Sequence, residues 1–139
     1  MAGKSIEIAT KALMLFLQSL PAKSYYQIIG FGSTYKKYDK TPKEYSEKNI
    51  KESIKVIEGL SADLGGTDIY TPLKDIYNSN KAYNKIVLPK NIFLLTDCEI
   101  EDKDKTLKLI EKNNSNFSIY LVGRWKFWPR FNKKCGYFR

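Results

Sequence analysis

The chain has 139 residues, of which 42% are hydrophobic and 14% aromatic, so it can form one domain with a buried core. It contains no histidine and only two cysteines, which excludes histidine-based catalysis, His-containing zinc sites and disulfide-rich scaffolds. The net charge of +9 is concentrated at one end, because residues 124–139 hold six basic side chains and no acidic one.

The N-terminal segment indicates where the protein resides. The sequence leads directly into a helical pattern, without the apolar core and cleavage site of a signal peptide. It also has no apolar run near the roughly 20 residues that a membrane span needs. We therefore expect a soluble, cytoplasmic domain.

The first predicted elements are a helix and a strand pair. Apolar residues recur at three- and four-residue spacings through residues 6–20, which is typical of an amphipathic helix, and Pro21 ends it. Residues 25–31 form a short β-prone run. We expect residues 33–38 to return beside it as an antiparallel edge strand.

Two further helices are predicted before the next strand. Ser46 is placed to cap the first of them. Its inner face is predicted to consist of Ile50, Ile54, Ile57 and Leu60. Residues 63–68 form an irregular, glycine-containing turn, and Thr71 is predicted to cap a short helix with Pro72 at its first position.

The last elements alternate strand, helix and strand. Residues 91–97 form an apolar run that ends in polar residues, as in a buried parallel strand. A helix opens at Asp102 or Asp104, and residues 117–122 form the final strand. This order predicts an α/β fold with an open, mostly parallel sheet and helices on both faces.

Two polar sites fall where such folds bind ligands, beyond the carboxyl ends of strands. Asp97 follows the strand at residues 92–95, and Thr67 ends the Gly65-Gly66-Thr67 turn. A carboxylate and a hydroxyl are oxygen ligands suited to Mg²⁺ or Ca²⁺. An aspartate after a strand is common, however, and a structural role explains the same residues.

Four stretches of the sequence carry a family resemblance, in a shared order and at compatible spacing. They are Met1-Ala2-Gly3-Lys4, Ile29-Gly30-Phe31-Gly32-Ser33, Ala62-Asp63-Leu64-Gly65-Gly66-Thr67-Asp68, and Phe93-Leu94-Leu95-Thr96-Asp97 with Glu99. Over residues 1–123 the chain resembles a von Willebrand factor type A (VWA) domain, of the sort found in inter-alpha-trypsin-inhibitor heavy chains and the vault poly(ADP-ribose) polymerase.

The resemblance implies a metal-ion-dependent adhesion site, which joins an Asp-x-Ser-x-Ser motif, a threonine and an aspartate. Thr67 matches the threonine and Asp97 the aspartate. The Asp-x-Ser-x-Ser motif is missing, because family members carry it directly before a segment like Met1-Ala2-Gly3. Since a hard cation needs about six oxygen ligands, we expect this incomplete site to hold Mg²⁺ or Mn²⁺ weakly or not at all.

The resemblance also implies an N-terminally truncated fold. The first strand, which would lie in the centre of the sheet, and the last elements of the family fold are missing. Unpaired buried backbone groups cost about 1–3 kcal/mol each. We therefore expect marginal stability, with a free energy of unfolding not well above about 5 kcal/mol.

The implied function is non-enzymatic binding of a protein partner, whose own carboxylate would complete the coordination of the metal. Enzymatic alternatives are disfavoured. Gly30-Phe31-Gly32 lacks the third glycine and the helix of a dinucleotide fingerprint, there is no phosphate-binding P-loop motif, and no nucleophile has an identifiable base.

Residues 124–139 and Cys98 leave alternatives open. The basic and aromatic tail of residues 124–139 can bind nucleic acid or an anionic surface, pack over bare sheet surface, or be an aberrant end. Cys98 stands where relatives carry glycine, and it is either a position without a role or a soft metal ligand or redox site.

Overall fold

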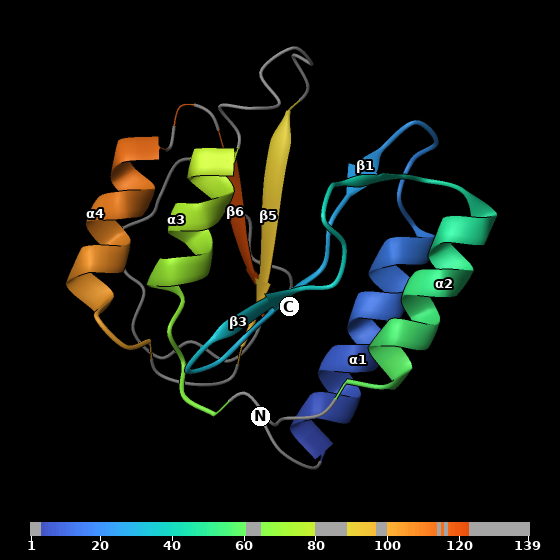
Figure 1. The fold of residues 1–139 in the computed structure, drawn as a ribbon, viewed down its shortest axis with the longest axis horizontal. Helices are drawn as coiled ribbons and strands as arrows, with labels where there is room; N and C mark the ends of the chain where they lie inside the picture. The colour runs from blue at the N-terminus through green and yellow to red at the C-terminus, as the bar shows by residue number, and fades with distance from the viewer. Residues whose placement is uncertain are drawn as a thin grey trace. The chain divides into compact units, whose positions relative to one another are not determined.

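A computed structural model describes residues 4–60, 65–79, 89–96, 100–113, 115 and 117–122 (Figure 1). Among these residues the chain order is one helix, four strands and two helices, followed by a strand, a helix and a strand. The chain divides into an N-terminal unit, Met1–Gly66, and a C-terminal unit, Thr67–Arg139. None of the described helices is long and apolar enough to cross a membrane.

Two helices pack against each other in the N-terminal unit, α1 (Lys4–Gln18) and α2 (Glu47–Glu58) (Figure 1). The Ser46 side chain accepts a hydrogen bond from the Asn49 backbone N–H at 3.1 Å, which confirms Ser46 as the N-cap of α2. This bond satisfies one of the backbone donors that a helix leaves free at its start. The sequence therefore specifies this helix start locally.

The strands of the N-terminal unit are short and antiparallel. β1 (Tyr25–Tyr26) pairs with β4 (Lys43–Glu44), and β2 (Ile29–Phe31) pairs with β3 (Tyr35–Lys37). The predicted return strand is thus confirmed in β3. The pairing of β4, whose two residues are charged, was not predicted from the sequence.

The single strand predicted over residues 25–31 is wrong, since the chain leaves the β ladder at Gln27 and Ile28. The Gln27 side chain donates to the Asp39 carbonyl at 2.7 Å, and the Ile28 carbonyl accepts from the Tyr38 N–H at 3.2 Å. Ile28 is 8% exposed and belongs to the core. At Gln27 and Ile28 the chain is therefore held by these hydrogen bonds and by the burial of Ile28, and not by pairing in a β ladder.

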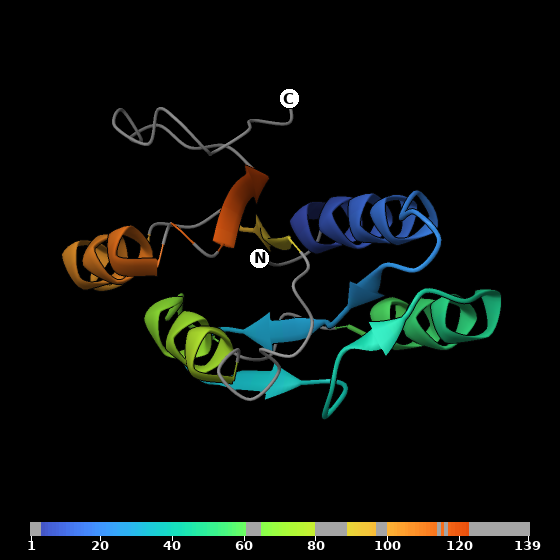
Figure 2. The same cartoon turned by 90° about the horizontal axis from the view of Figure 1, so that it is seen from above.

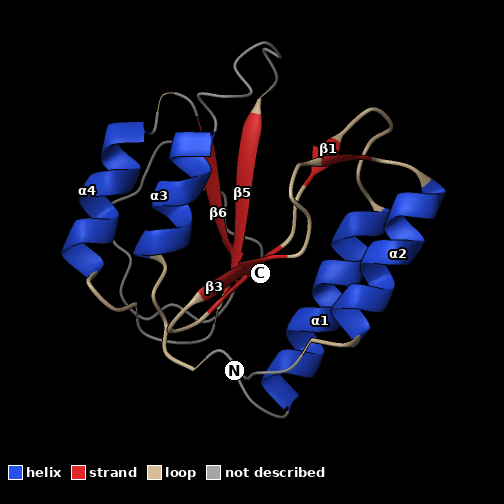
Figure 3. Cartoon of the chain, viewed as in Figure 1, coloured by secondary structure: helices blue, strands red, loops and turns tan. Residues whose placement is uncertain are grey.

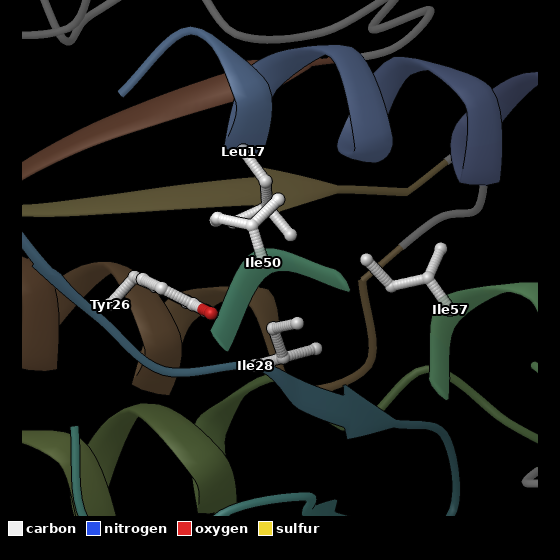
Figure 4. Packing of buried hydrophobic residues seen from close by; sticks show 5 residues of the cluster. All are labelled: Leu17, Tyr26, Ile28, Ile50 and Ile57. Atoms are coloured by element: carbon white, nitrogen blue, oxygen red, sulfur yellow. The ribbon is translucent and has the colours of Figure 1, made fainter. Parts of the chain in front are cut away.

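A continuous hydrophobic cluster holds the N-terminal unit together, and Figure 4 shows Leu17 of α1 and Ile50 of α2 pointing toward each other. The cluster is formed by Leu17, Tyr26, Ile28, Ile50 and Ile57. Ile57 is fully buried. Ile54 packs against the cluster, so the predicted inner face of α2 is confirmed for its helical residues. Leu60 also packs against the cluster, although it lies beyond the end of α2 at Glu58.

The C-terminal unit is built on a parallel ladder of β5 (Lys90–Leu95) and β6 (Phe117–Val122). α3 (Tyr70–Ser79) and α4 (Lys103–Asn113) contact each other and lie on the same side of this ladder (Figures 1 and 2). The Tyr77 ring of α3 meets the Phe117 ring edge-on at 4.9 Å between centroids. Both parallel strands were predicted.

The described strands form three two-stranded ladders, one of them parallel, instead of the continuous, mostly parallel sheet that the sequence predicts (Figure 3). β5 pairs with β6 along one edge, and its other edge carries no ladder in the described part of the chain. A larger continuous sheet would need a further strand paired with this edge of β5, and no described strand pairs there.

Candidate functional site

The predicted turn before α3 is present in the described residues from Gly65 onward. Gly65 has a φ of +60° and Gly66 a φ of +31°. Residues with a side chain rarely adopt such values, whereas glycine does so without a steric penalty. The two glycines therefore let the chain bend immediately before Thr67.

Thr67 is buried, with 8% of its surface exposed, and two hydrogen bonds join it to Glu101. Its backbone N–H donates to Oε1 of Glu101 at 3.1 Å, and its carbonyl accepts from the Glu101 N–H at 3.3 Å. Glu101 lies two residues before α4, which begins at Lys103. The turn is thus attached to the segment that leads from β5 into α4.

Asp68 caps α3, which corrects the prediction that Thr71 caps this helix. The Asp68 carboxylate accepts hydrogen bonds from the Thr71 N–H, at 3.1 Å, and from the Thr71 hydroxyl. α3 begins at Tyr70, so Thr71 and Pro72 lie inside its first turn. Pro72 fits there because the first N–H groups of a helix have no partner within it.

The end of β5 is buried, with Leu94 at 7% and Thr96 at 5% exposure. Asp97, the second predicted site residue, follows Thr96 directly and lies outside the described residues, as does Cys98. The proximity of Thr67 and Asp97 therefore stays a prediction. The described neighbour of Thr67 is Glu101, four positions after Asp97 in the sequence.

The acidic residues at the start of α4, Asp102 and Asp104, have structural roles in that helix. The Asp102 carbonyl accepts from the Thr106 N–H at 3.0 Å, and its carboxylate lies 3.4 Å from the Lys105 ammonium. Asp104 lies in the first turn, where a negative charge favours the helix dipole. Within the described ranges no three acidic or cysteine side chains gather as a metal site would require.

Sequence reasoning did not single out Glu101. An acidic residue just before a helix has an obvious local role, and its partner Thr67 is 34 positions away in the chain. No spacing rule links the two. The basic tail at residues 124–139 lies outside the described residues, so its role stays a prediction.

Known proteins resemble this chain both in sequence and in fold. A sequence model described as the von Willebrand factor type A domain matches residues 1–124. Von Willebrand factor A domain-containing protein 5A of Rattus norvegicus is 34% identical over 118 residues, which cover 85% of this chain and 14% of that protein. A von Willebrand factor A domain-containing protein of Dictyostelium discoideum is 32% identical over 123 residues, 88% of this chain and 13% of its own length.

A solved structure supports the fold. It is described as von Willebrand factor type A from Catenulispora acidiphila, and it matches with a TM-score of 0.74 at 16% identity, covering 98% of this chain and 35% of its own. The α/β fold predicted from the sequence is therefore confirmed. On these grounds the chain belongs to the von Willebrand factor type A domain family.

Proposed function

We propose that this domain binds a protein partner at the turn that carries Thr67, with Asp97 as the second contact and Mg²⁺ or Mn²⁺ as the bridging ion. Membership of a family of protein-interaction modules supports binding as its role. The observation that carries the location is the burial of Thr67 and its attachment to Glu101 beyond the carboxyl end of β5. Ligands of open α/β folds bind at that end.

The donor set fits a weak cation site. In the described part of the chain, Thr67 contributes a hydroxyl, whereas the Asp68 carboxylate is engaged by Thr71 and Oε1 of Glu101 by the Thr67 N–H. The 139 residues contain no Asp-x-Ser-x-Ser motif. Because Mg²⁺ needs about six oxygen ligands, water would supply most of them, and a partner carboxylate would add one more.

The proposed role is binding without catalysis. The sequence has no histidine to act as a general base, and no nucleophile stands in a recognisable sequence motif with a partner base. A turn held by hydrogen bonds between Thr67 and Glu101 suits recognition of a partner surface. The chain spans about one seventh of the length of the curated relatives that it matches, so the partners of a larger protein are not inferred from it.

Calorimetric titration with Mn²⁺ tests the proposal. We expect weak binding near millimolar Mn²⁺ in the unaltered chain. Thr67→Val, which keeps the branched shape and removes the hydroxyl, and Asp97→Asn should each abolish the binding heat. Asp104→Asn removes an exposed carboxylate at the start of α4 and serves as the matched control. Binding that survives Thr67→Val, or no heat at millimolar Mn²⁺ in the unaltered chain, would reject the cation site.

A second candidate function is binding of nucleic acid or an anionic surface by residues 124–139. Six basic side chains interleaved with aromatic ones favour it, and the segment lies almost wholly beyond the residues that the family model matches. Removing residues 124–139 should then abolish affinity for single-stranded oligonucleotides and its salt dependence. Affinity that persists with an unchanged salt dependence would exclude the tail as the site.

A further inference from the structure

The two hydrogen bonds between Thr67 and Glu101 form a closed, reciprocal pair. Each residue donates its backbone N–H to the other, one to the carboxylate and one to the carbonyl, at 3.1 and 3.3 Å. The acceptor of the Thr67 N–H is a charged oxygen, and such hydrogen bonds are stronger than neutral ones. We call this pair the Thr67–Glu101 clasp.

The chain on either side of Thr67 shows why a clasp is needed. Gly65 and Gly66 precede it, and glycine gives the backbone more freedom than any other residue. Asp68 follows it and is fixed to Thr71 by the cap of α3. The cap therefore holds the chain after Thr67, and the clasp holds the backbone of Thr67 itself.

Glu101 also connects the turn to the segment between β5 and α4. That segment begins after Thr96, which is 5% exposed, and contains Asp97 in the sequence. The Glu101 side chain is solvent-exposed, yet it reaches a buried backbone group. Both hydrogen bonds of Glu101 to the turn therefore involve the backbone of Thr67.

We propose that Glu101 is a positioning residue that fixes the backbone of Thr67, and through it the direction of the Thr67 hydroxyl. The consequence for cation binding rests on the proposed function, whereas the clasp itself does not. The carboxylate acts through the position of its oxygen and not through its charge alone. Variants of Glu101 that keep either the position of the oxygen or the negative charge, but not both, separate these two contributions.

Amide hydrogen exchange of Thr67, measured by NMR on the full chain, tests the clasp. Glu101→Ala should speed exchange about ten-fold or more, because the N–H loses a charged acceptor. Glu101→Gln keeps an acceptor oxygen at the same reach and should retain most of the protection. Glu101→Asp keeps the charge but shortens the side chain, and it should expose the amide as Glu101→Ala does.

The controls separate a local effect from unfolding. Asp104→Ala removes an exposed carboxylate three positions away and should leave Thr67 exchange unchanged. Amides of the β5–β6 ladder, in the same unit as Thr67 and Glu101, report whether the C-terminal unit of each variant still folds. An unchanged exchange rate of the Thr67 amide in Glu101→Ala would overturn the clasp. The clasp would also be overturned if the Thr67 amide lost its protection in Glu101→Gln and kept it in Glu101→Asp.

Mn²⁺ titration of the same variants tests the positioning role. We expect Glu101→Ala and Glu101→Asp to weaken Mn²⁺ binding about ten-fold, the low end for residues that orient a metal ligand, and Glu101→Gln to restore it. Unaltered affinity in Glu101→Ala, with Thr67 exchange increased, would overturn the positioning role. If the unaltered chain binds no Mn²⁺, the proposed cation site fails, and the exchange data still decide the clasp.

Discussion

In the N-terminal unit the buried polar side chain among the described residues is Ser53, whereas the C-terminal unit buries Thr67, Thr96 and Thr106. Ser53 lies within the core, and its hydroxyl meets the Tyr26 hydroxyl at 2.9 Å. The three threonines lie where elements begin or end: before α3, after β5 and near the start of α4.

This difference separates two uses of burial. In the N-terminal unit a polar pair completes a continuous apolar cluster, so burial there contributes to stability. In the C-terminal unit the buried polar groups lie before α3, after β5 and in the first turns of α4, and hydrogen bonds to Glu101 hold the backbone of Thr67. We therefore expect substitutions in the N-terminal cluster to change stability most and those at the threonine positions to change it less.

The largest expected effect is at Ile57, which is fully buried in the N-terminal cluster. Ile57→Ala should lower the free energy of unfolding by about 2–5 kcal/mol, because it removes apolar contacts and leaves a cavity. Urea unfolding followed by far-ultraviolet circular dichroism measures this change. If the variant does not fold, Ile57→Val should still cost about 0.5–1.5 kcal/mol.

Val56 provides the matched control for Ile57. It lies next to Ile57 in α2 and is 39% exposed. Val56→Ala should change the free energy of unfolding by less than about 1 kcal/mol, since little buried area is lost. Equal losses at the two positions would show that the cluster does not stabilise the N-terminal unit as described.

The next effect concerns the Tyr26–Ser53 hydrogen bond inside the cluster. Tyr26→Phe or Ser53→Ala alone should cost about 1–3 kcal/mol, because each leaves one buried hydroxyl without a partner. The double variant should cost less than the sum of the two. A double-mutant cycle from urea midpoints measures this coupling, and strictly additive losses would contradict a direct hydrogen bond.

Thr106 offers the opposite case in the C-terminal unit. It is 1% exposed, and in the described part of the chain its hydroxyl has no hydrogen-bond partner. Thr106→Val keeps the shape and removes the unsatisfied oxygen, so it should raise the free energy of unfolding by about 1 kcal/mol. A thermal or urea melt that shows a loss instead would indicate that this hydroxyl does have a partner.

The smallest expected effect depends on pH and on Lys43. The hydrogen bond to Asp39, at 2.8 Å, raises the pKa of Lys43, and the Glu52 carboxylate at 3.7 Å adds to this. A raised pKa means that the charged lysine stabilises the fold at lower pH. That stability is lost as the pH rises through the folded-state pKa.

Lys43→Met isolates the contribution of this ion pair. The unaltered chain should be a few tenths of a kcal/mol more stable than the variant near pH 8, since the pair is partly exposed. The difference should disappear between about pH 10 and 12, where lysine titrates. Urea midpoints measured across this range test it, and a difference that grows with pH would reverse the sign of the argument.

The elements that the sequence predicts well are those whose signals are local. Ser46 caps α2 through a residue three positions away, and the apolar runs of β5 and β6 pair in parallel as expected. The broken strand at residues 25–31 was not predictable, because the side-chain bond of Gln27 and the burial of Ile28 depend on tertiary contacts.

The candidate site shows the same limit. Thr67 was predicted from its turn and from the family resemblance, but its hydrogen-bond partner Glu101 is distant in the chain and carries no motif. The sequence analysis assigned the cap of α3 to Thr71, whereas the Asp68 carboxylate accepts the hydrogen bond of the Thr71 N–H and caps the helix. Asp97, Cys98, the metal ion and the tail at residues 124–139 stay predictions.

The backbone of Asp102, which has a φ of +48°, carries a consequence for sequence divergence. Aspartate, asparagine and glycine tolerate this left-handed conformation, whereas β-branched residues such as valine do not. In homologues that keep a glutamate at the position of Glu101 and enter the following helix by the same bend, the adjoining position should vary only within that small set. Orthologues with aspartate, asparagine or glycine at the position of Asp102 would then be the ones that retain the bend, and a sequence survey can identify them.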